Sequence, residues 1–178
     1  MEEQFHAFQQ ALIHFSHYDE ALWKALRPHS RIRRLHKNAI LSAQSFDAFL
    51  VTKGILSLEA TESDRIIHFI SPGCIVPDSY LESNLCYHVQ EEAILITVPL
   101  HTLEEVHRKY PGLYHLEKDI IANWMRMINY GKELLDMDKH LRKRRFKELF
   151  PGVPGNIPNV VIARYLAISR EYFGKTDW

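Results

Sequence analysis

The residues from Val161 to Lys175, VIARYLAISREYFGK, carry the pattern that decides the fold. Apolar residues flank Ala167-Ile168 at roughly helical spacing, which is typical of two short helices joined by a turn. The small side chain of Ala163 allows the two helices to cross closely, and Ser169 is a favoured N-cap for the second helix. The expected shared core of this helix pair consists of Ile162, Leu166, Ile168 and Phe173.

A helix capped by Ser169 presents charged side chains on one exposed face, namely Arg170, Glu171 and Lys175. In the major groove of DNA, arginine pairs with guanine edges, glutamate accepts from cytosine, and lysine reaches guanine or phosphate. These residue types in the first turns are typical of the recognition helix of a helix-turn-helix. We therefore expect residues 161–175 to contact double-stranded DNA.

The net charge of zero hides an uneven distribution along the chain. Residues 139–178 hold nine Lys and Arg against three Asp and Glu, a balance of +6. Residues 1–138 hold 13 against 19, a balance of −6. A local surplus of cations is typical of a surface that meets a polyanion. Besides the residues named above, the expected DNA contacts are Arg164, Arg142, Lys143 and Arg144.

Upstream of the basic region the pattern changes twice. The stretch from Glu2 to Leu26 has apolar residues at helical intervals, with a break at which Ser16 or Asp19 can cap a second helix. Residues 30–99 instead contain short β-like runs separated by turn sequences, which favour a sandwich, jelly roll or barrel of roughly eight strands. The expected strands include residues 31–35, 48–52, 54–58, 65–70 and 93–98.

One long helix is expected from about Leu113 to Met137. At 1.5 Å per residue it would be roughly 35 Å long, so the short β region leaves one of its sides uncovered. A second copy of the helix is the natural cover, which predicts a homodimer; the alternative is a core helix of the monomer. Gly131 either weakens this helix or allows a partner backbone to approach. The apolar stripe expected at the dimer contact consists of Leu116, Ile120, Trp124, Met127 (or Ile128) and Leu134.

Four motifs, in this order along the chain, resemble those of the Crp/Fnr family of transcription regulators. They are FLVTKGILSL from Phe49 to Leu58, FISPGCIV from Phe69 to Val76, Tyr110-Pro111-Gly112, and SREYFGK from Ser169 to Lys175. The resemblance implies an α+β fold with N-terminal helices and a double-stranded β-helix (jelly-roll) sensor in residues 1–111, a dimerisation helix in 112–138 and a helix-turn-helix in 139–178. It also implies a homodimer on a palindromic DNA operator, with RNA polymerase as a further partner.

The ligand loop departs from the pattern of the family's cyclic-nucleotide binders. These hold the ribose with a glutamate and the phosphate with an arginine, but here Asp78 and Leu85-Cys86 fall at those places. No Lys or Arg lies between Arg65 and Arg108, so a cyclic phosphate would be buried without a cation, and we do not expect cyclic AMP as the effector. The alternatives are a filled barrel or a pocket for another, unidentified small molecule. Such a pocket would be lined by Gly73, Asp78, Tyr80, Cys86, Tyr87 and His88.

Metal, haem and catalytic chemistry find little support in the sequence. Two cysteines, Cys74 and Cys86, cannot hold an iron–sulfur cluster, and the alternative of a haem would need His68 or His88 as axial ligand. Neither the histidine and glutamate spacing of a cupin, nor G-x-S-x-G, nor a glycine-rich phosphate loop occurs. We therefore expect no enzyme, no metal and no resident cofactor. The apolar runs are too short to span a membrane and the N-terminus has no secretory signal, so we expect a cytoplasmic protein.

The helix-turn-helix is expected to be short. Trp178 follows Lys175 by three residues, so no wing is expected, and Gly174 costs the second helix about 1 kcal/mol relative to alanine. The sequence therefore predicts a DNA-binding transcription regulator with an unknown effector. The alternative is a ligand-sensing or protein-interaction module that has lost productive DNA binding.

Overall fold

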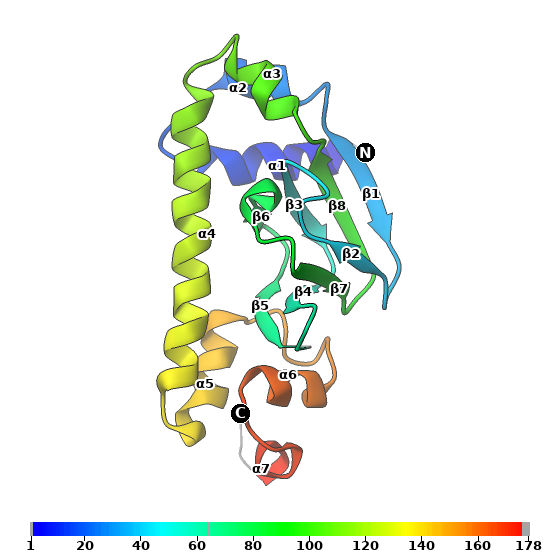
Figure 1. Cartoon of the computed structure of the whole chain (residues 1–178), viewed down its shortest axis with the longest axis vertical. Coiled ribbons are helices and arrows are strands. Elements are labelled where there is room, and N and C mark those ends of the chain that lie inside the picture. Colours follow the sequence, from blue (N-terminus) through cyan, green and yellow to red (C-terminus); the bar gives the residue numbers. More distant parts are fainter. Residues whose placement is uncertain (1, 64, 176–178) are drawn as a thin grey trace.

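Two four-stranded antiparallel sheets face each other in the computed structural model, which describes residues 2–63 and 65–175 (Figure 1). The first sheet has the order β1-β8-β3-β6 and the second the order β2-β7-β4-β5. The eight strands of the described residues are β1 (Arg31–Leu35), β2 (Ile40–Ser42), β3 (Ala48–Lys53), β4 (Leu56–Ala60), β5 (Ile66–Ile70), β6 (Ile75–Val76), β7 (Leu85–Val89) and β8 (Ala93–Val98). The expected jelly-roll architecture is therefore present as a pair of packed antiparallel sheets.

Apolar side chains fill the space between the two sheets. Because side chains alternate along a strand, Leu56 and Leu58 of β4 point inward together with Tyr87 and Val89 of β7. Phe49 packs edge-to-face on Tyr87, with ring centroids 5.1 Å apart. All five side chains are at most 1 % exposed. The filled barrel, which was one of the two alternatives from the sequence, is what the structure contains.

The N-terminal helices α1 (Glu2–Ile13) and α2 (Glu20–Leu26) cover the outer face of the first sheet. Asp19 caps α2, since its carboxylate accepts a hydrogen bond of 2.9 Å from the backbone N–H of Ala21. Phe8 and Trp23 from the two helices meet edge-to-face above this sheet. A short helix, α3 (Thr102–His107), and a 3-10 turn, η1 (Asp78–Tyr80), complete this part of the chain.

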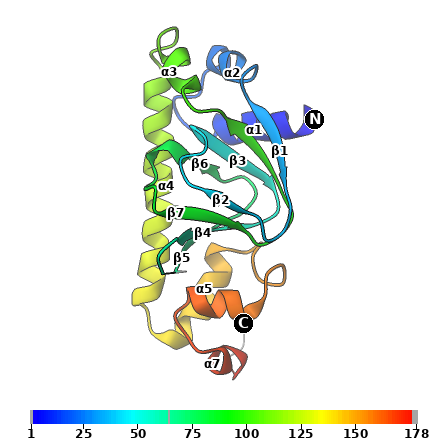
Figure 2. The same cartoon turned by 45° about the vertical axis from the view of Figure 1, so that its right-hand side comes forward.

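The long helix α4 (Leu113–Asp136) runs along one side of both sheets and contributes to all three apolar clusters of the molecule (Figures 1 and 2). Its inward face holds the stripe that the sequence analysis assigned to a dimer contact. Leu116, Trp124 and Leu134 are 1–2 % exposed, Ile120 is 9 % exposed, and Met127 is partly buried against the barrel core. This stripe packs against the chain's own sheets and helices, so its assignment to the dimer contact was wrong for these residues. A sequence stripe shows that a face is apolar, but not what covers it.

Three short helices follow, α5 (Lys139–Leu149), α6 (Asn159–Tyr165) and α7 (Arg170–Lys175), and together they form the helix-turn-helix unit. The backbone N–H of Tyr172 donates to Ser169 Oγ at 3.1 Å, which confirms the predicted cap of α7. The turn places Ala167 in the left-handed region with φ of 52°. The predicted shared core residues Ile162, Leu166, Ile168 and Phe173 are all buried.

The helix-turn-helix unit packs on the outer face of the second sheet (Figure 1). Phe69 of β5 contacts the rings of Phe146, Phe150 and Tyr165, with centroids 5.1 to 5.9 Å apart. Any continuation of the recognition helix, and the wing that was expected to be missing, would involve residues 176–178, which lie outside the described residues. No helix in the described ranges is long and apolar enough to cross a membrane.

Candidate nucleic-acid interface

Helix α7 lies at the end of the molecule farthest from the N-terminal helices (Figure 2). Arg170, Glu171 and Lys175 are all exposed, as the sequence analysis expected. Glu171 and Lys175 form an ion pair one helical turn apart. No hydrogen bond or ion pair with another described residue occupies the Arg170 guanidinium. The first turn of α7 can therefore present a free arginine and a carboxylate to a ligand.

Helix α5 adds cations to the same end of the molecule. Arg144 is exposed and, within the described ranges, makes no ion pair. Lys139 and Lys147, which the sequence analysis did not select, are exposed as well. Arg145 is exposed but pairs with Glu148 at 2.7 Å. The periodicity of a helix (residues three and four apart share a face) could have separated the exposed cations from the buried ones before the structure was known.

Lys143 was expected to contact DNA, but it is a structural residue. Its side chain is 4 % exposed, and its ammonium donates a 3.0 Å hydrogen bond to the carbonyl of Phe173. The same ammonium lies 4.3 Å from the centre of the Phe173 ring. Lys143 therefore holds α7 against α5. The reason for the correction is local, since position 143 falls on the face of α5 that also carries the buried Phe146.

Arg142 is also engaged within the protein. Its Nε donates to the carbonyl of Met137 and its Nη1 to the carbonyl of Leu166, both at 2.9 Å. These carbonyls lie at the ends of α4 and α6, where helices leave acceptors without an intrahelical partner. Arg142 therefore ties three helices together through two of its guanidinium nitrogens.

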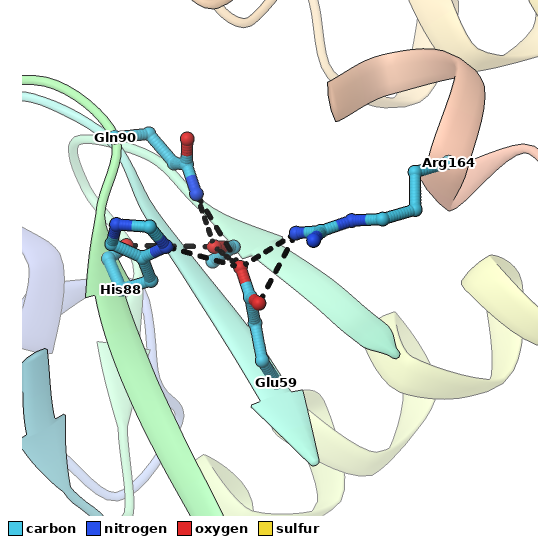
Figure 3. A network of polar contacts seen from close by, with 5 residues as sticks. Glu59, His88, Gln90 and Arg164 are labelled. Carbon is cyan, nitrogen blue, oxygen red and sulfur yellow. Dashed lines mark hydrogen bonds and ion pairs between the residues drawn. The ribbon is translucent and has the colours of Figure 1, made fainter. Parts of the chain in front are cut away.

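Arg164 is the third predicted DNA contact that the structure assigns to an internal partner. Its Nη2 lies 3.2 and 3.1 Å from the two carboxylate oxygens of Glu59, on strand β4 of the second sheet (Figure 3). The two residues are 105 positions apart in the sequence, so no local pattern could have revealed the pair. Arg164 remains 44 % exposed although it pairs with Glu59. Of the other seven predicted DNA contacts, Arg142 and Lys143 are engaged inside the helix-turn-helix unit, and the exposed residues are Ser169, Arg170, Glu171, Lys175 and Arg144.

The residues of the predicted ligand pocket do not converge on one cavity. The Asp78 carboxylate is fully buried, and it accepts hydrogen bonds from the backbone N–H groups of Gln44 and Phe46 and from the hydroxyl of Tyr87. Burial raises the pKa of Asp78, and these hydrogen bonds oppose that rise. Asp78 and Tyr87 therefore satisfy each other inside the fold and cannot also hold a ligand.

The other four predicted pocket residues lie on separate surfaces. Cys86 and His88 are on the outer face of β7, because Tyr87 between them points into the barrel. Gly73 borders a polar cleft of about 450 Å³ beside α1 and α4. Tyr80 is 59 % exposed and lies at the edge of an apolar groove. The predicted pocket is therefore corrected: its residues share a stretch of sequence but not a cavity.

His68, one of the two candidate haem ligands, is buried between aromatic rings. The ring centroids of Trp124 and Phe150 lie 5.6 and 5.1 Å from that of the imidazole. Burial lowers the pKa of His68 to about 4, and the adjoining cavity has only about 110 Å³. Ligand pockets for drug-sized molecules are about 300 to 1,000 Å³, so the space beside His68 does not fit a haem. Among the described residues, no group of His, Cys, Asp and Glu has the arrangement of a metal site.

An apolar groove of about 460 Å³ runs between the C-terminal half of α4 and the edge of the second sheet. Met125, Ile128 and Leu135 of α4 line it, and Ile121 and the exposed Tyr114 continue the same line toward the N-terminal end of the helix. In chain order these residues are Tyr114, Ile121, Met125, Ile128 and Leu135, and they are separated by 7, 4, 3 and 7 positions. Such spacing is typical of the contact face of a coiled coil, and we call this line of residues the seam. Apart from Ile128, which the sequence analysis gave as an alternative member of the stripe, this seam lies next to the buried stripe. The heptad spacing in the sequence is the signal that could have found it.

Solved structures with a similar fold include proteins described as regulators. The regulator CLP of Xanthomonas campestris, named as c-di-GMP responsive, has a TM-score of 0.66 and 15% identity, with 88% of this chain and 89% of that chain covered. A protein of Eubacterium rectale, described as a transcriptional regulator of the Crp/Fnr family, has a TM-score of 0.69 and 12% identity over 89% and 81%. The chain has a Crp/Fnr-like fold. FixK2 of Bradyrhizobium japonicum has a TM-score of 0.68 and 18% identity, with 82% of this chain and 81% of that chain covered.

Identities of 12 to 18% establish a common fold and no more. Neither a known protein-family profile nor a characterised protein matches the chain by sequence. The Crp/Fnr-like fold nevertheless confirms the resemblance that the four sequence motifs indicated. In this fold, the barrel, the long helix and the helix-turn-helix occur in the order that was expected.

Proposed function

We propose that the chain is a sequence-specific DNA-binding transcription regulator of the Crp/Fnr type. The observation that carries this proposal is the solvent-exposed first turn of α7. Ser169 caps the helix there, Arg170 has no ion pair among the described residues, and the exposed Glu171 pairs with Lys175 one turn further on. The exposed cations of α5 lie at the same end of the molecule and suit the phosphate backbone. The regulators with the same fold support the proposal at the level of the fold.

The experiment selects duplexes from a random library and then measures binding by fluorescence anisotropy at several salt concentrations. We expect Arg170→Ala to relax the sequence preference at one position of the selected site, at a cost of about 1–3 kcal/mol for the best sequence. Arg144→Ala should weaken binding to all sequences alike and reduce the salt slope by about 1. Arg34→Ala, an exposed position on β1, is the control and should leave binding unchanged. Failure to enrich any sequence, together with no binding at low salt, would remove the proposal.

The active species in this proposal is a homodimer in which two α4 helices pack along the seam from Tyr114 to Leu135. The partner's helix would cover the groove beside Met125, which is 51 % exposed in the single chain. The proposed units are residues 1–111 for the sensor, 112–138 for the dimer helix and 139–178 for the helix-turn-helix. We also propose contacts to RNA polymerase, which the resemblance implies, and a place in the cytoplasm.

A second candidate function is an interaction module that has lost productive DNA binding. The observation in its favour is that Arg142, Lys143 and Arg164 all have partners within the protein, which leaves fewer cations for DNA. In this case the library selection enriches nothing, while the dimer still forms. The two functions are thus separated by the same experiment.

A further inference from the structure

A buried carboxylate lies in the contact between the second sheet and the helix-turn-helix unit. Glu59 is on the outward face of β4, since Leu58 before it points into the barrel core. Its side chain is 8 % exposed, whereas most glutamates are solvated. A buried ionised carboxylate is unfavourable unless it is paired and hydrogen-bonded, so its partners explain why it is tolerated.

The partners of Glu59 come from the sheet and from one helix of the helix-turn-helix unit (Figure 3). Ser57 Oγ donates to Oε1 at 2.5 Å, Gln90 Nε2 lies 3.4 Å from the same oxygen, and His88 Nδ1 lies 3.7 Å from it. All three belong to β4, to β7 or to the residue that follows β7. Arg164 of α6 contacts both oxygens, at 3.2 and 3.1 Å. Among the described residues, Arg164 is the one member of this cluster that comes from the helix-turn-helix unit.

The rest of the contact between the two parts is apolar. Phe69 of β5 packs against Phe146, Phe150 and Tyr165, and burial of such surface is favourable but has no preferred direction. A single guanidinium nitrogen, Nη2 of Arg164, contacts both oxygens of the Glu59 carboxylate, and a charge-assisted hydrogen bond of this kind is directional. The apolar contact therefore stabilises the packing of the helix-turn-helix unit on the sheet, and the ion pair fixes the orientation of that unit.

We propose that the Glu59–Arg164 ion pair is a clasp that joins β4 and α6 into one cooperative unit. A clasp of this kind fixes the orientation of the recognition helix, because α7 is packed on α6 through their shared core. Leu58, the neighbour of Glu59 on β4, lines the apolar groove along α4. A movement of β4 caused by a molecule in the groove would then reach α6. The clasp does not depend on DNA binding and stands if the proposed function fails.

The test is native-state hydrogen exchange, measured by mass spectrometry on the full chain over a range of low denaturant concentrations. This method assigns amides that open together to one unit. In the wild type, residues 56–60 and 159–166 should share one opening transition. In Glu59→Gln and Arg164→Gln, residues 159–166 should open separately and exchange about tenfold faster, while residues 56–60 keep their protection.

Three further variants complete the experiment. The double variant Glu59→Gln/Arg164→Gln should exchange no faster than Arg164→Gln, because both changes remove one interaction. Arg164→Lys keeps the positive charge but replaces the planar guanidinium by an ammonium on a flexible chain, and should give an intermediate rate. Arg145→Gln is the matched control, since Arg145 pairs with Glu148 inside α5, and it should leave both segments in one transition.

Separate transitions in the wild type would overturn the clasp, and so would a single transition that survives both single substitutions. Effects that multiply in the double variant would also overturn it, because they would show that Glu59 and Arg164 act independently. Arg164→Gln leaves a buried carboxylate and can lower protection throughout the chain. Glu59→Gln leaves no buried charge, and its result decides the question in that case.

Discussion

His68 is a buried histidine whose surroundings favour the neutral ring. Its Nδ1 is buried without a hydrogen-bond partner among the described residues, and the rings of Trp124 and Phe150 flank it. Burial disfavours the charged imidazolium and lowers the pKa of His68 from 6.5 to about 4. The unfolded chain therefore takes up a proton between these values and the folded chain does not.

This difference predicts the pH dependence of stability. The free energy of unfolding should fall as the pH decreases from about 6.5 to about 4, by up to about 3 kcal/mol for this one group. His68→Gln should remove that part of the slope, whatever it does to stability at neutral pH. His6→Gln, at an exposed position on α1, should leave the slope as in the wild type. Chemical denaturation at a series of pH values measures the slope of the free energy of unfolding against pH. Equal slopes for His68→Gln and the wild type would contradict the prediction.

Ala167 occupies a backbone conformation that favours glycine, with φ of 52° at the turn between α6 and α7. We expect Ala167→Gly to raise the free energy of unfolding by about 0.5–1 kcal/mol, because the strain of a Cβ in this region outweighs the entropy that glycine gains when unfolded. Ala163→Gly, inside α6, should have the opposite sign and cost about 1 kcal/mol. Denaturant titrations of both variants test the pair, and a loss of stability in Ala167→Gly would refute the expectation.

At the scale of elements, Gly131 allows α4 and α6 to approach each other. A Cβ at this position would lie 2.6 Å from the hydroxyl oxygen of Tyr165 and 3.7 Å from Nδ1 of His68. The sequence analysis left open whether this glycine weakens the helix or accommodates a partner backbone. The structure shows a third role, in which the glycine accommodates a tyrosine from the chain's own helix-turn-helix unit.

This close approach predicts a pair of compensating substitutions. Gly131→Ala should lower the free energy of unfolding by about 1–3 kcal/mol through overpacking, although alanine is the better helix former. Tyr165→Phe removes the crowding hydroxyl, so the double variant should recover most of the loss. The measurement is the free energy of unfolding, by heat or denaturant, of the wild type, the two single variants and the double variant. Simple additivity of the two changes would show that they do not meet.

Strands and helices were predicted best where apolar residues repeat at regular intervals along the sequence. The five expected strands were found with ends shifted by at most two residues, and the long helix ends at Asp136 where Met137 was expected. What could not be predicted depends on contacts between distant parts of the chain. The partner of Arg164 is 105 residues away, and the inward face of α4 is set by where the sheets lie. The fold was therefore predictable in outline, while the candidate site was only partly so.

At the scale of the whole molecule, the proposed homodimer depends on the seam along α4. Met125→Glu places a charge in the proposed dimer contact, and we expect it to weaken dimerisation at least about tenfold. Arg126→Glu is the adjacent control, because Arg126 borders the polar cleft on the other side of α4. Sedimentation equilibrium measures both dissociation constants. A monomeric wild type at high concentration, or equal effects of the two substitutions, would disprove the seam.

The strand order also has a consequence for how the chain reaches its native state. The first sheet pairs β1 with β8, so Arg31 lies opposite Thr97, 66 residues later. Contacts between such distant residues form only after the entropy of a long loop has been lost, which slows folding to the order of milliseconds to seconds. During synthesis, the sheet cannot close until Val98 has left the ribosome. The helix-turn-helix unit, which docks on β4 and β5, must then wait for a finished barrel.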